Sequence, residues 1–135
     1  MTTLVTGGAG YIGSHTVRLL ASQGRDVVVL DSLELGDRSR IPGIPCVEAD
    51  IADERAIEKA CRKYGIDDVI HFAAYKAVGE SMEQPLRYYN NNVAGSIALV
   101  HALLANGVER IVFSSSAAVY GNPDHVPVNE DAPLK

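Results

Sequence analysis

The stretch Thr6-Gly7-Gly8-Ala9-Gly10-Tyr11-Ile12-Gly13 lies near the start of the chain, between a short apolar run and an amphipathic run. Residues 3–5 before it predict a buried strand, and the residues after it predict a helix with one face formed by Ile12, Leu19 and Leu20. Glycine allows a tight turn, close packing of helix on strand, and close approach of backbone to a phosphate. The first N–H groups of the helix lack partners within it and can meet an anion. The stretch therefore predicts a turn that holds a dinucleotide pyrophosphate.

Asp31 supports this interpretation, because it ends a second predicted strand over residues 26–30 and lies 18 positions after Gly13. A carboxylate at about this offset accepts hydrogen bonds from the adenosine ribose hydroxyls. It would repel a 2′-phosphate, and no arginine follows it directly, which favours NAD over NADP. The alternative is that Asp31 only caps a turn at the end of the strand.

Composition indicates an ordinary soluble globular domain, with 47% hydrophobic and 21% charged residues in 135 positions. A chain of this size can bury about two thirds of the surface that its unfolded form exposes. The net charge of −5 argues against nucleic acid as a partner. There is no apolar stretch long enough for a membrane span and no leader-like segment, so we expect a cytoplasmic protein.

Cysteine and histidine spacing predicts no metal site. Cys46 and Cys61 are 15 positions apart and match no paired-ligand spacing, so we expect buried thiols. The four histidines show no i, i+4 pair. His71 lies within a predicted strand and is expected to be structural.

Strands and helices alternate along the chain, which is typical of parallel strands joined by right-handed helical crossovers. Further strands are expected at residues 45–49, 68–74 and 110–114, and loops at residues 32–44 and from residue 115 onward. Asp53 is a predicted N-cap of a helix that Gly65 closes. Ser81 and Gln84 have capping-box spacing, and Pro85 suits the first turn of a long helix ending near Gly107. One face of that helix is predicted to hold Leu86, Tyr89, Val93, Ile97, Val100 and Leu104.

This order predicts an α/β fold, a Rossmann-type doubly wound parallel sheet of five strands. Ligands of such sheets lie beyond the carboxyl ends of the strands. Asp31 and Asp50 follow the second and third predicted strands, Lys76 follows the fourth, and residues 114–116 follow the fifth. We expect one ligand crossing this edge to meet them all.

Four stretches together resemble the extended short-chain dehydrogenase/reductase family, also described as NAD-dependent epimerases and dehydratases. They are residues 6–15, Lys76-Ala77-Val78-Gly79-Glu80-Ser81, Tyr89-Asn90-Asn91-Asn92-Val93, and Ser114-Ser115-Ser116-Ala117-Ala118-Val119-Tyr120-Gly121. The glycine and serine stretches are shared by many nucleotide-sugar enzymes of the family. The stretch that begins at Lys76 is the more selective match, and it is similar to that of the UDP-sugar 4-epimerases.

The resemblance implies a role for each matching position. Ser116 would hydrogen-bond the sugar hydroxyl that is oxidised, and Asp31 would hold the adenosine ribose of NAD. Asp50 and Ile51 would flank the adenine, and Lys76 would contact the nicotinamide ribose region. The full set of implied cofactor residues is Gly7, Gly10, Tyr11, Ile12, Gly13, Asp31, Ser32, Asp50, Ile51, Phe72, Ala73, Ala74, Lys76, Asn91 and Ser114. It also implies a UDP-sugar substrate and a homodimer.

The implied activity is interconversion of UDP-glucose and UDP-galactose in galactose metabolism, by oxidation at C4 and return of the hydride to the other face. The family's base is the tyrosine of a Tyr-x-x-x-Lys pair, and no tyrosine in these 135 residues has a lysine four positions later. We therefore expect an incomplete Rossmann domain, the amino-terminal part of a longer enzyme, without the substrate domain and close to inactive alone.

Two other functions remain open. A nucleotide-sugar 4,6-dehydratase or decarboxylase would need a further acid beside the serine stretch, and Ser116-Ala117-Ala118 offers none. A non-catalytic NAD-binding module would explain the missing Tyr-x-x-x-Lys pair, but it would leave Ser116 and the stretch from Lys76 without a purpose.

Overall fold

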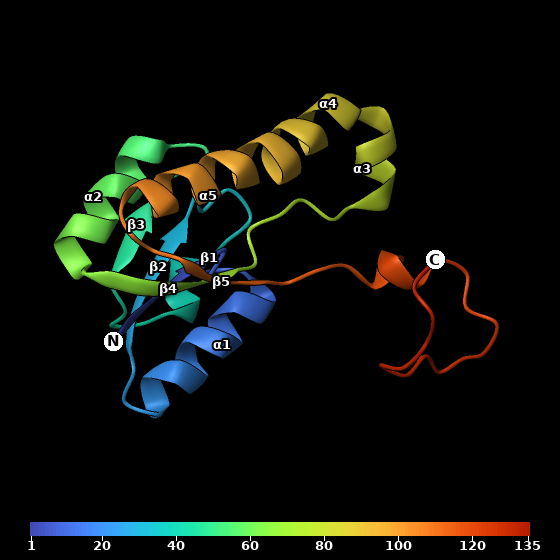
Figure 1. Cartoon of the computed structure of the whole chain (residues 1–135), viewed down its shortest axis with the longest axis horizontal. Coiled ribbons are helices and arrows are strands. Elements are labelled where there is room, and N and C mark those ends of the chain that lie inside the picture. Colours follow the sequence, from blue (N-terminus) through green and yellow to red (C-terminus); the bar gives the residue numbers. More distant parts are fainter.

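Five parallel strands form one sheet in the computed structural model, which describes residues 1–135 (Figure 1). They are β1 (Thr2–Thr6), β2 (Asp26–Asp31), β3 (Cys46–Glu48), β4 (Ile66–His71) and β5 (Arg110–Phe113), in the spatial order β3-β2-β1-β4-β5. Every neighbouring pair is parallel. The chain winds outward from β1 in both directions, so the predicted doubly wound Rossmann-type sheet is confirmed.

Helices cover both faces of the sheet, with α1 (Tyr11–Ser22) on one face and α2 (Glu54–Tyr64) and α5 (Ser96–Ala105) on the other (Figure 1). The long helix after β4 begins with α4 (Pro85–Tyr88) and passes through a π-helix, η2 (Tyr89–Gly95), into α5. A short helix, α3 (Val78–Glu83), precedes it and is separated from it by Gln84, at φ −129° and ψ 57°. Two 3₁₀ turns, η1 (Arg38–Arg40) and η3 (Ala117–Tyr120), interrupt the predicted loops. None of these helices combines the length and apolarity that a membrane span requires.

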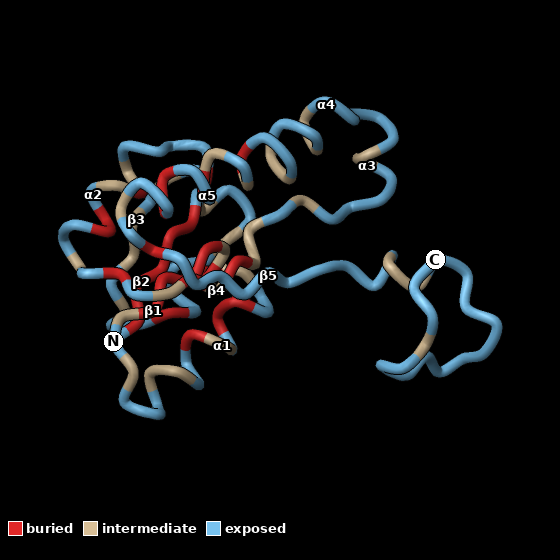
Figure 2. The backbone as a smooth tube through the Cα atoms, viewed as in Figure 1, coloured by how far each residue is buried: buried red, intermediate tan, exposed pale blue.

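The core has two layers, one on each face of the sheet. Along β1, Leu4 packs toward α2 and α5 with Ile57 and Leu99, whereas Val5 packs toward α1 with Val17. Alternate residues of a strand point to opposite faces, so a central strand buried on both sides is continuously apolar. Figure 2 shows the buried residues concentrated where the sheet meets its helices.

Three predicted helix boundaries are confirmed and one is wrong. Asp53 accepts a hydrogen bond from the N–H of Ala56 (3.0 Å), and Gly65 ends α2 in the left-handed conformation at φ 60°. Ser81 does not cap the next helix. It lies inside α3, where its hydroxyl donates to the carbonyl of Val78 (2.6 Å), because residues 78–83 are already helical. Pro85 is the first residue of α4, as predicted.

The predicted apolar faces differ from the buried ones. In α1, Ile12 and Leu19 are 54% and 57% exposed, and the buried residues are Gly13, Ser14 and Val17. Of the predicted face only Leu20 packs against the core, where it is half-buried. The small residues face the sheet because Gly13 must approach the glycine turn closely. In the long helix the predicted stripe from Leu86 to Leu104 is exposed, and Leu99, Ala102 and Leu103 are buried instead.

The cysteine prediction holds fully for one residue. Cys61 is buried in α2, whereas Cys46 is half-buried because β3 is a sheet edge. Burial raises the pKa of both thiols above its ordinary value, which makes them poor nucleophiles.

Two glycines with open surroundings provide a matched stability test. Nothing lies within 4 Å of a Cβ built on Gly65 or on Gly79, but Gly65 has φ +60° and Gly79 lies in helix α3. Gly65→Ala should therefore lower the free energy of unfolding by about 1 kcal/mol through backbone conformation alone. Gly79→Ala should leave it unchanged or raise it by up to about 1 kcal/mol. Urea unfolding followed by circular dichroism measures both, and a Gly65→Ala variant as stable as the parent would contradict the assigned left-handed cap.

Candidate cofactor-binding site

The glycine turn connects β1 to α1, and two of its glycines are required by the protein backbone itself. Gly7 has φ +67°, and a Cβ there would lie 2.7 Å from the backbone nitrogen of Ala73. A Cβ on Gly13 would lie 2.2 Å from the carbonyl oxygen of Gly7. Neither position can hold a side chain unless the turn moves. These glycines therefore close the turn against α1 and the segment after β4.

Gly10 differs, because the protein leaves the space around it largely open. It is the N-cap of α1 with ordinary extended dihedrals, φ −72° and ψ 177°, which any residue can adopt. The only atom within 4 Å of a Cβ there is the carbonyl oxygen of Gly7, at 3.1 Å. Its lack of a side chain thus keeps room beside the helix start that no part of this chain fills.

The start of α1 presents free backbone donors to that space. No side chain caps the helix and its first turn holds no acidic residue. The first i→i−4 bond runs from the N–H of Ser14 to the carbonyl of Gly10 (3.0 Å). The N–H groups of Tyr11, Ile12 and Gly13 precede it and can serve an anion. A glycine turn with an uncapped helix N-terminus fits the pyrophosphate of a dinucleotide.

Asp31 holds the turn from the side of β2. The carboxylate is buried, and its two oxygens accept hydrogen bonds from the N–H groups of Ala9 and Leu33, each at 2.9 Å. The second bond is the strand-end turn that the sequence left as an alternative, and it supports Leu33 at φ 58°. Each carboxylate oxygen keeps further acceptor capacity, so this structural role leaves room for a ligand hydroxyl.

The segment after β4 is held from two sides. Phe72 continues the β1 ladder through an N–H bond to the carbonyl of Thr6 (3.0 Å). Asn92 of the π-helix accepts from the N–H of Tyr75 and donates to its carbonyl, both at 2.9 Å. Lys76 follows directly with an exposed side chain. The backbone that carries Lys76 is therefore fixed, and its long side chain is free to reach a ligand.

A buried polar chain links β1, β4 and α5. Ser96 donates from its hydroxyl to the carbonyl of Asn92 (2.8 Å), so it accepts from Nε2–H of His71 (3.0 Å). Nδ1 of His71 then accepts from the hydroxyl of Thr6 (2.6 Å). Burial lowers the pKa of His71, which keeps the ring neutral. The predicted structural role of this histidine is consistent with these contacts.

The implied adenine-side residues have mostly local partners. Asp50 is exposed and accepts from the N–H of Ala52 (2.7 Å), and the hydroxyl of Ser32 accepts from the N–H of Glu34 (3.5 Å). Ile51 is a core residue at 4% exposure and packs beneath Gly95. Only the backbone of Ile51 is free to face a ligand, since its side chain packs in the core.

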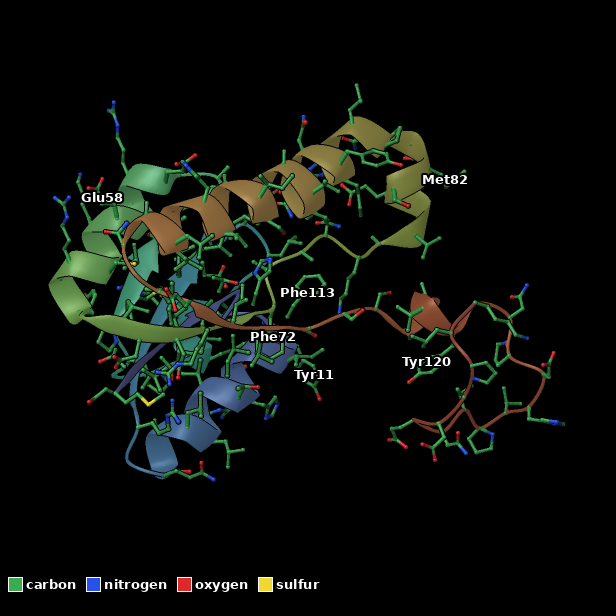
Figure 3. All side chains as sticks on the ribbon, in the orientation of Figure 1. Tyr11, Glu58, Phe72, Met82, Phe113 and Tyr120 are labelled. Carbon is green, nitrogen blue, oxygen red and sulfur yellow. The ribbon has the colours of Figure 1, made fainter.

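The serine stretch leaves the sheet at the end of β5. The N–H of Ser114 donates to the carbonyl of His71 (3.1 Å), and Ser116 is exposed and caps η3 by accepting from Ala118 (3.1 Å). Figure 3 shows Tyr11, Phe72 and Phe113 at the carboxyl end of the strands, with Tyr120 of η3 farther out. No hydrogen bond joins Ser116 to the glycine turn or to the segment after β4. The structure thus groups the glycine turn, Asp31 and the Lys76 segment, and leaves Ser116 apart.

Sequence reasoning missed the residues that position this edge. Asn92 holds the backbone of Tyr75 in place. The implied cofactor residue Asn91 takes part in this contact only indirectly, through a hydrogen bond from its side-chain amide to that of Asn92 (2.8 Å). Thr6 and Ser96 orient His71. The sequence marked two of these residues by position alone: Thr6 is the first residue of the glycine stretch, and Asn92 is the last of three consecutive asparagines.

Comparison with known proteins places this geometry in a family context. Residues 3–135 match the NAD dependent epimerase/dehydratase family. The chain is 47% identical over 133 residues to the UDP-glucose 4-epimerase of Halalkalibacterium halodurans, covering 98% of this chain and 40% of that protein. It spans about 40% of the length of the curated relatives that it matches.

Solved structures agree with the fold. The UDP-glucose 4-epimerase of Stenotrophomonas maltophila, crystallised with bound NAD and formylated UDP-arabinopyranose, superposes with a TM-score of 0.90 at 50% identity over 100% of this chain and 43% of that one. The dTDP-glucose 4,6-dehydratase DesIV of Streptomyces venezuelae, with NAD and TYD bound, gives a TM-score of 0.86 at 35% identity over 100% of this chain and 45% of that one.

Titration of His71 should make stability depend on pH. Burial lowers its folded-state pKa, so as the pH falls below about 6.5 the unfolded chain takes up the proton first. The free energy of unfolding should therefore fall, with a slope approaching about 1.4 kcal/mol per pH unit from this group. Urea unfolding measured between about pH 8 and pH 5.5 gives the unfolding free energy at each pH, and its slope against pH should be smaller in His71→Gln than in the parent. His125→Gln, at an exposed histidine, is the control and should keep the slope of the parent. Equal slopes in His71→Gln and the parent would mean that His71 protonates in the folded state.

Proposed function

This chain belongs to the NAD dependent epimerase/dehydratase family, and we propose that residues 1–135 are the cofactor-binding part of a cytoplasmic UDP-sugar 4-epimerase that interconverts UDP-glucose and UDP-galactose. The observation that carries the proposal is the uncapped start of α1 beside the open space at Gly10. Two UDP-glucose 4-epimerases reach 47% and 50% identity, and these stronger matches support this substrate class. The epimerase of Thermotoga maritima, at 34%, is as distant from this chain as the dehydratase, at 35%.

The proposed cofactor contacts follow the carboxyl edge of the sheet. The N–H groups of Tyr11, Ile12 and Gly13 would bind the pyrophosphate of NAD, and Asp31 would accept from the adenosine ribose. NAD, when bound, supplies the reversible hydride acceptor. Lys76 would contact the other ribose. The remaining contacts are assigned to Ser32, Asp50, the Ile51 backbone, Phe72, Ala73, Ala74, Asn91 and Ser114.

For the sugar, Ser116 would hydrogen-bond the C4 hydroxyl. The proton of that hydroxyl requires a base, and none of the six tyrosines here has a lysine four positions later. Since the chain spans about 40% of its relatives, we place the base and the substrate domain in the rest of a longer protein. Residues 1–135 alone are then expected to bind cofactor without turning over UDP-sugars.

An exposed apolar stripe supports a homodimer as part of the proposal. The exposed large apolar residues of the long helix are Leu86, Tyr89, Val93, Ile97, Val100 and Leu104. A helix that is apolar all round is normally covered on both sides. One side of this helix packs on the sheet, so the other offers an interface for the same helix of a second copy.

The first test of the proposal is cofactor binding. The protein should bind NAD about one to two decades more tightly than NADP, because Asp31 would repel the 2′-phosphate and hydrogen-bond the ribose. Gly10→Val should abolish binding, since its side chain enters the space beside the helix start, while the far-ultraviolet circular dichroism stays unchanged. Calorimetric titration measures both. Near-native NAD affinity in Gly10→Val would reduce the glycine stretch to a structural turn, and equal NADP affinity would remove the role of Asp31.

The second test is activity. A longer protein that includes the proposed base should epimerise UDP-galactose in a coupled assay, and residues 1–135 alone should not. Ser116→Ala in the longer protein should lower kcat by about ten- to a hundredfold through loss of one hydrogen bond to the reacting hydroxyl, with NAD binding kept. Ser22→Ala is the control, because that hydroxyl only bonds the carbonyl of Leu19 (2.7 Å) in α1. Turnover by residues 1–135 alone, or a fully active Ser116→Ala variant, would overturn the respective assignment.

A further inference from the structure

A set of side-chain contacts joins the loop after β2 to the segment after β4. The carboxylate of Glu34 accepts from the hydroxyl of Tyr75 with one oxygen and pairs with the guanidinium of Arg87 with the other. The Arg87 guanidinium also lies 4.4 Å above the centre of the Tyr75 ring. We call these three residues, Glu34, Tyr75 and Arg87, the strap. Each member contacts the other two, so the contact does not depend on a single hydrogen bond.

Neighbouring residues hold Arg87 in place. Its second nitrogen pairs with one carboxylate oxygen of Glu80, and the other oxygen of Glu80 accepts from the hydroxyl of Tyr88 (2.7 Å). The rings of Tyr75 and Tyr88 are 5.6 Å apart. Arg87 is thus oriented by the carboxylate of Glu80 and by the ring of Tyr75, and it directs its other terminal nitrogen toward Glu34.

The sheet order determines where the strap lies. β1 is between β2 and β4, so the glycine turn that follows β1 lies between the two segments that the strap joins. Glu34 comes three residues after Asp31, and Tyr75 directly precedes Lys76. The contact between them therefore crosses the carboxyl end of β1, on the same edge as the open space beside Gly10.

Both ends of the strap stand on fixed backbone. The loop after β2 is tied to the glycine turn, where the carbonyl of Ala9 accepts from the N–H of Asp37 (3.0 Å) and from Arg40 (3.3 Å). The backbone of Tyr75 is clamped by Asn92. Opening the strap therefore needs only the side-chain contacts to break, while the loops stay in place.

We propose that the strap is a gate across the dinucleotide site, which sets how fast the cofactor enters and leaves. The inference rests on the proposed function of the glycine turn. All strap contacts are between residues of this chain, so the strap forms whether or not a ligand lies beneath it. A barrier of this kind slows association and dissociation together. Arg87 and Glu34 keep 33% and 47% of their side-chain surface exposed, so each contact is modest and the barrier is crossed by thermal motion.

Stopped-flow binding of NADH, followed by its fluorescence, tests the gate on this protein. Glu34→Ala removes both contacts of the carboxylate and should raise the association and dissociation rate constants together by about three- to tenfold, with Kd changed by less than about threefold. Tyr75→Phe removes only the hydroxyl bond and should give a smaller change in both rates. Glu58→Ala is the matched control, because Glu58 pairs with Arg62 on α2, far from the site (Figure 3).

The outcomes separate the gate from its premise. Faster dissociation with unchanged association would mean that Glu34 stabilises the bound cofactor, and it would overturn the gate. Unchanged rates in both Glu34→Ala and Tyr75→Phe would overturn it too. Should Glu34→Ala lose its circular dichroism signal, Tyr75→Phe decides the question alone. If the parent binds no NADH at all, the proposed cofactor function fails and the gate with it, whereas normal binding with unaltered variant rates refutes the gate only.

Discussion

The structure depends on the close approach of the Gly7 backbone to α1 and to the segment after β4. A Cβ on Gly13 would lie 2.2 Å from the Gly7 carbonyl, and one on Gly7 would lie 2.7 Å from Ala73. This contact fixes the direction in which α1 leaves β1 and brings its uncapped N-terminus to the sheet edge. The same contact turns the small residues of α1 toward the sheet and leaves Ile12 exposed. One steric constraint thus determines both the packing of the helix and the position of the free N–H donors at its start.

Polar groups at this edge serve the fold first, and the proposed ligand would share them. Asp31 satisfies Ala9 and Leu33, and Asn92 satisfies both backbone groups of Tyr75. Loops at a sheet edge leave N–H and C=O groups without ladder partners, and a buried group without a partner costs about 1–3 kcal/mol. Side chains that meet this need also make the edge rigid. A rigid edge is what a binding site requires, since little ordering is left to occur when the ligand arrives.

Signals of two kinds predicted the fold well. The first kind is local backbone chemistry, which acts in the glycine turn after β1 and at the two caps of α2, Asp53 and Gly65. The second is the alternation of strands and helices along the chain, which specifies a parallel sheet. The capping box at Ser81 failed because residues 78–83 are helical already, a tertiary outcome that local spacing does not report. The hydrogen bonds of Asn92 to Tyr75, and those of Thr6 and Ser96 to His71, were not predicted either, because they join residues 17 to 65 positions apart. Hydrogen bonds at such separations leave no periodic pattern in a single sequence.

The long helix shows why periodicity could not predict which face is buried. Its apolar stripe runs from Leu86 to Leu104, a span of 18 residues, which is five turns of a helix with 3.6 residues per turn, so the stripe stays on one side. The opposite side carries Gly95, Leu99, Ala102 and Leu103 against the sheet. Two apolar faces on one helix satisfy the same pattern, so periodicity does not distinguish them. The inner face is the one on which Gly95 allows close contact with Ile51. The outward face then keeps its apolar residues for a reason other than the core of this domain, and that is the physical ground for expecting another protein surface to cover it.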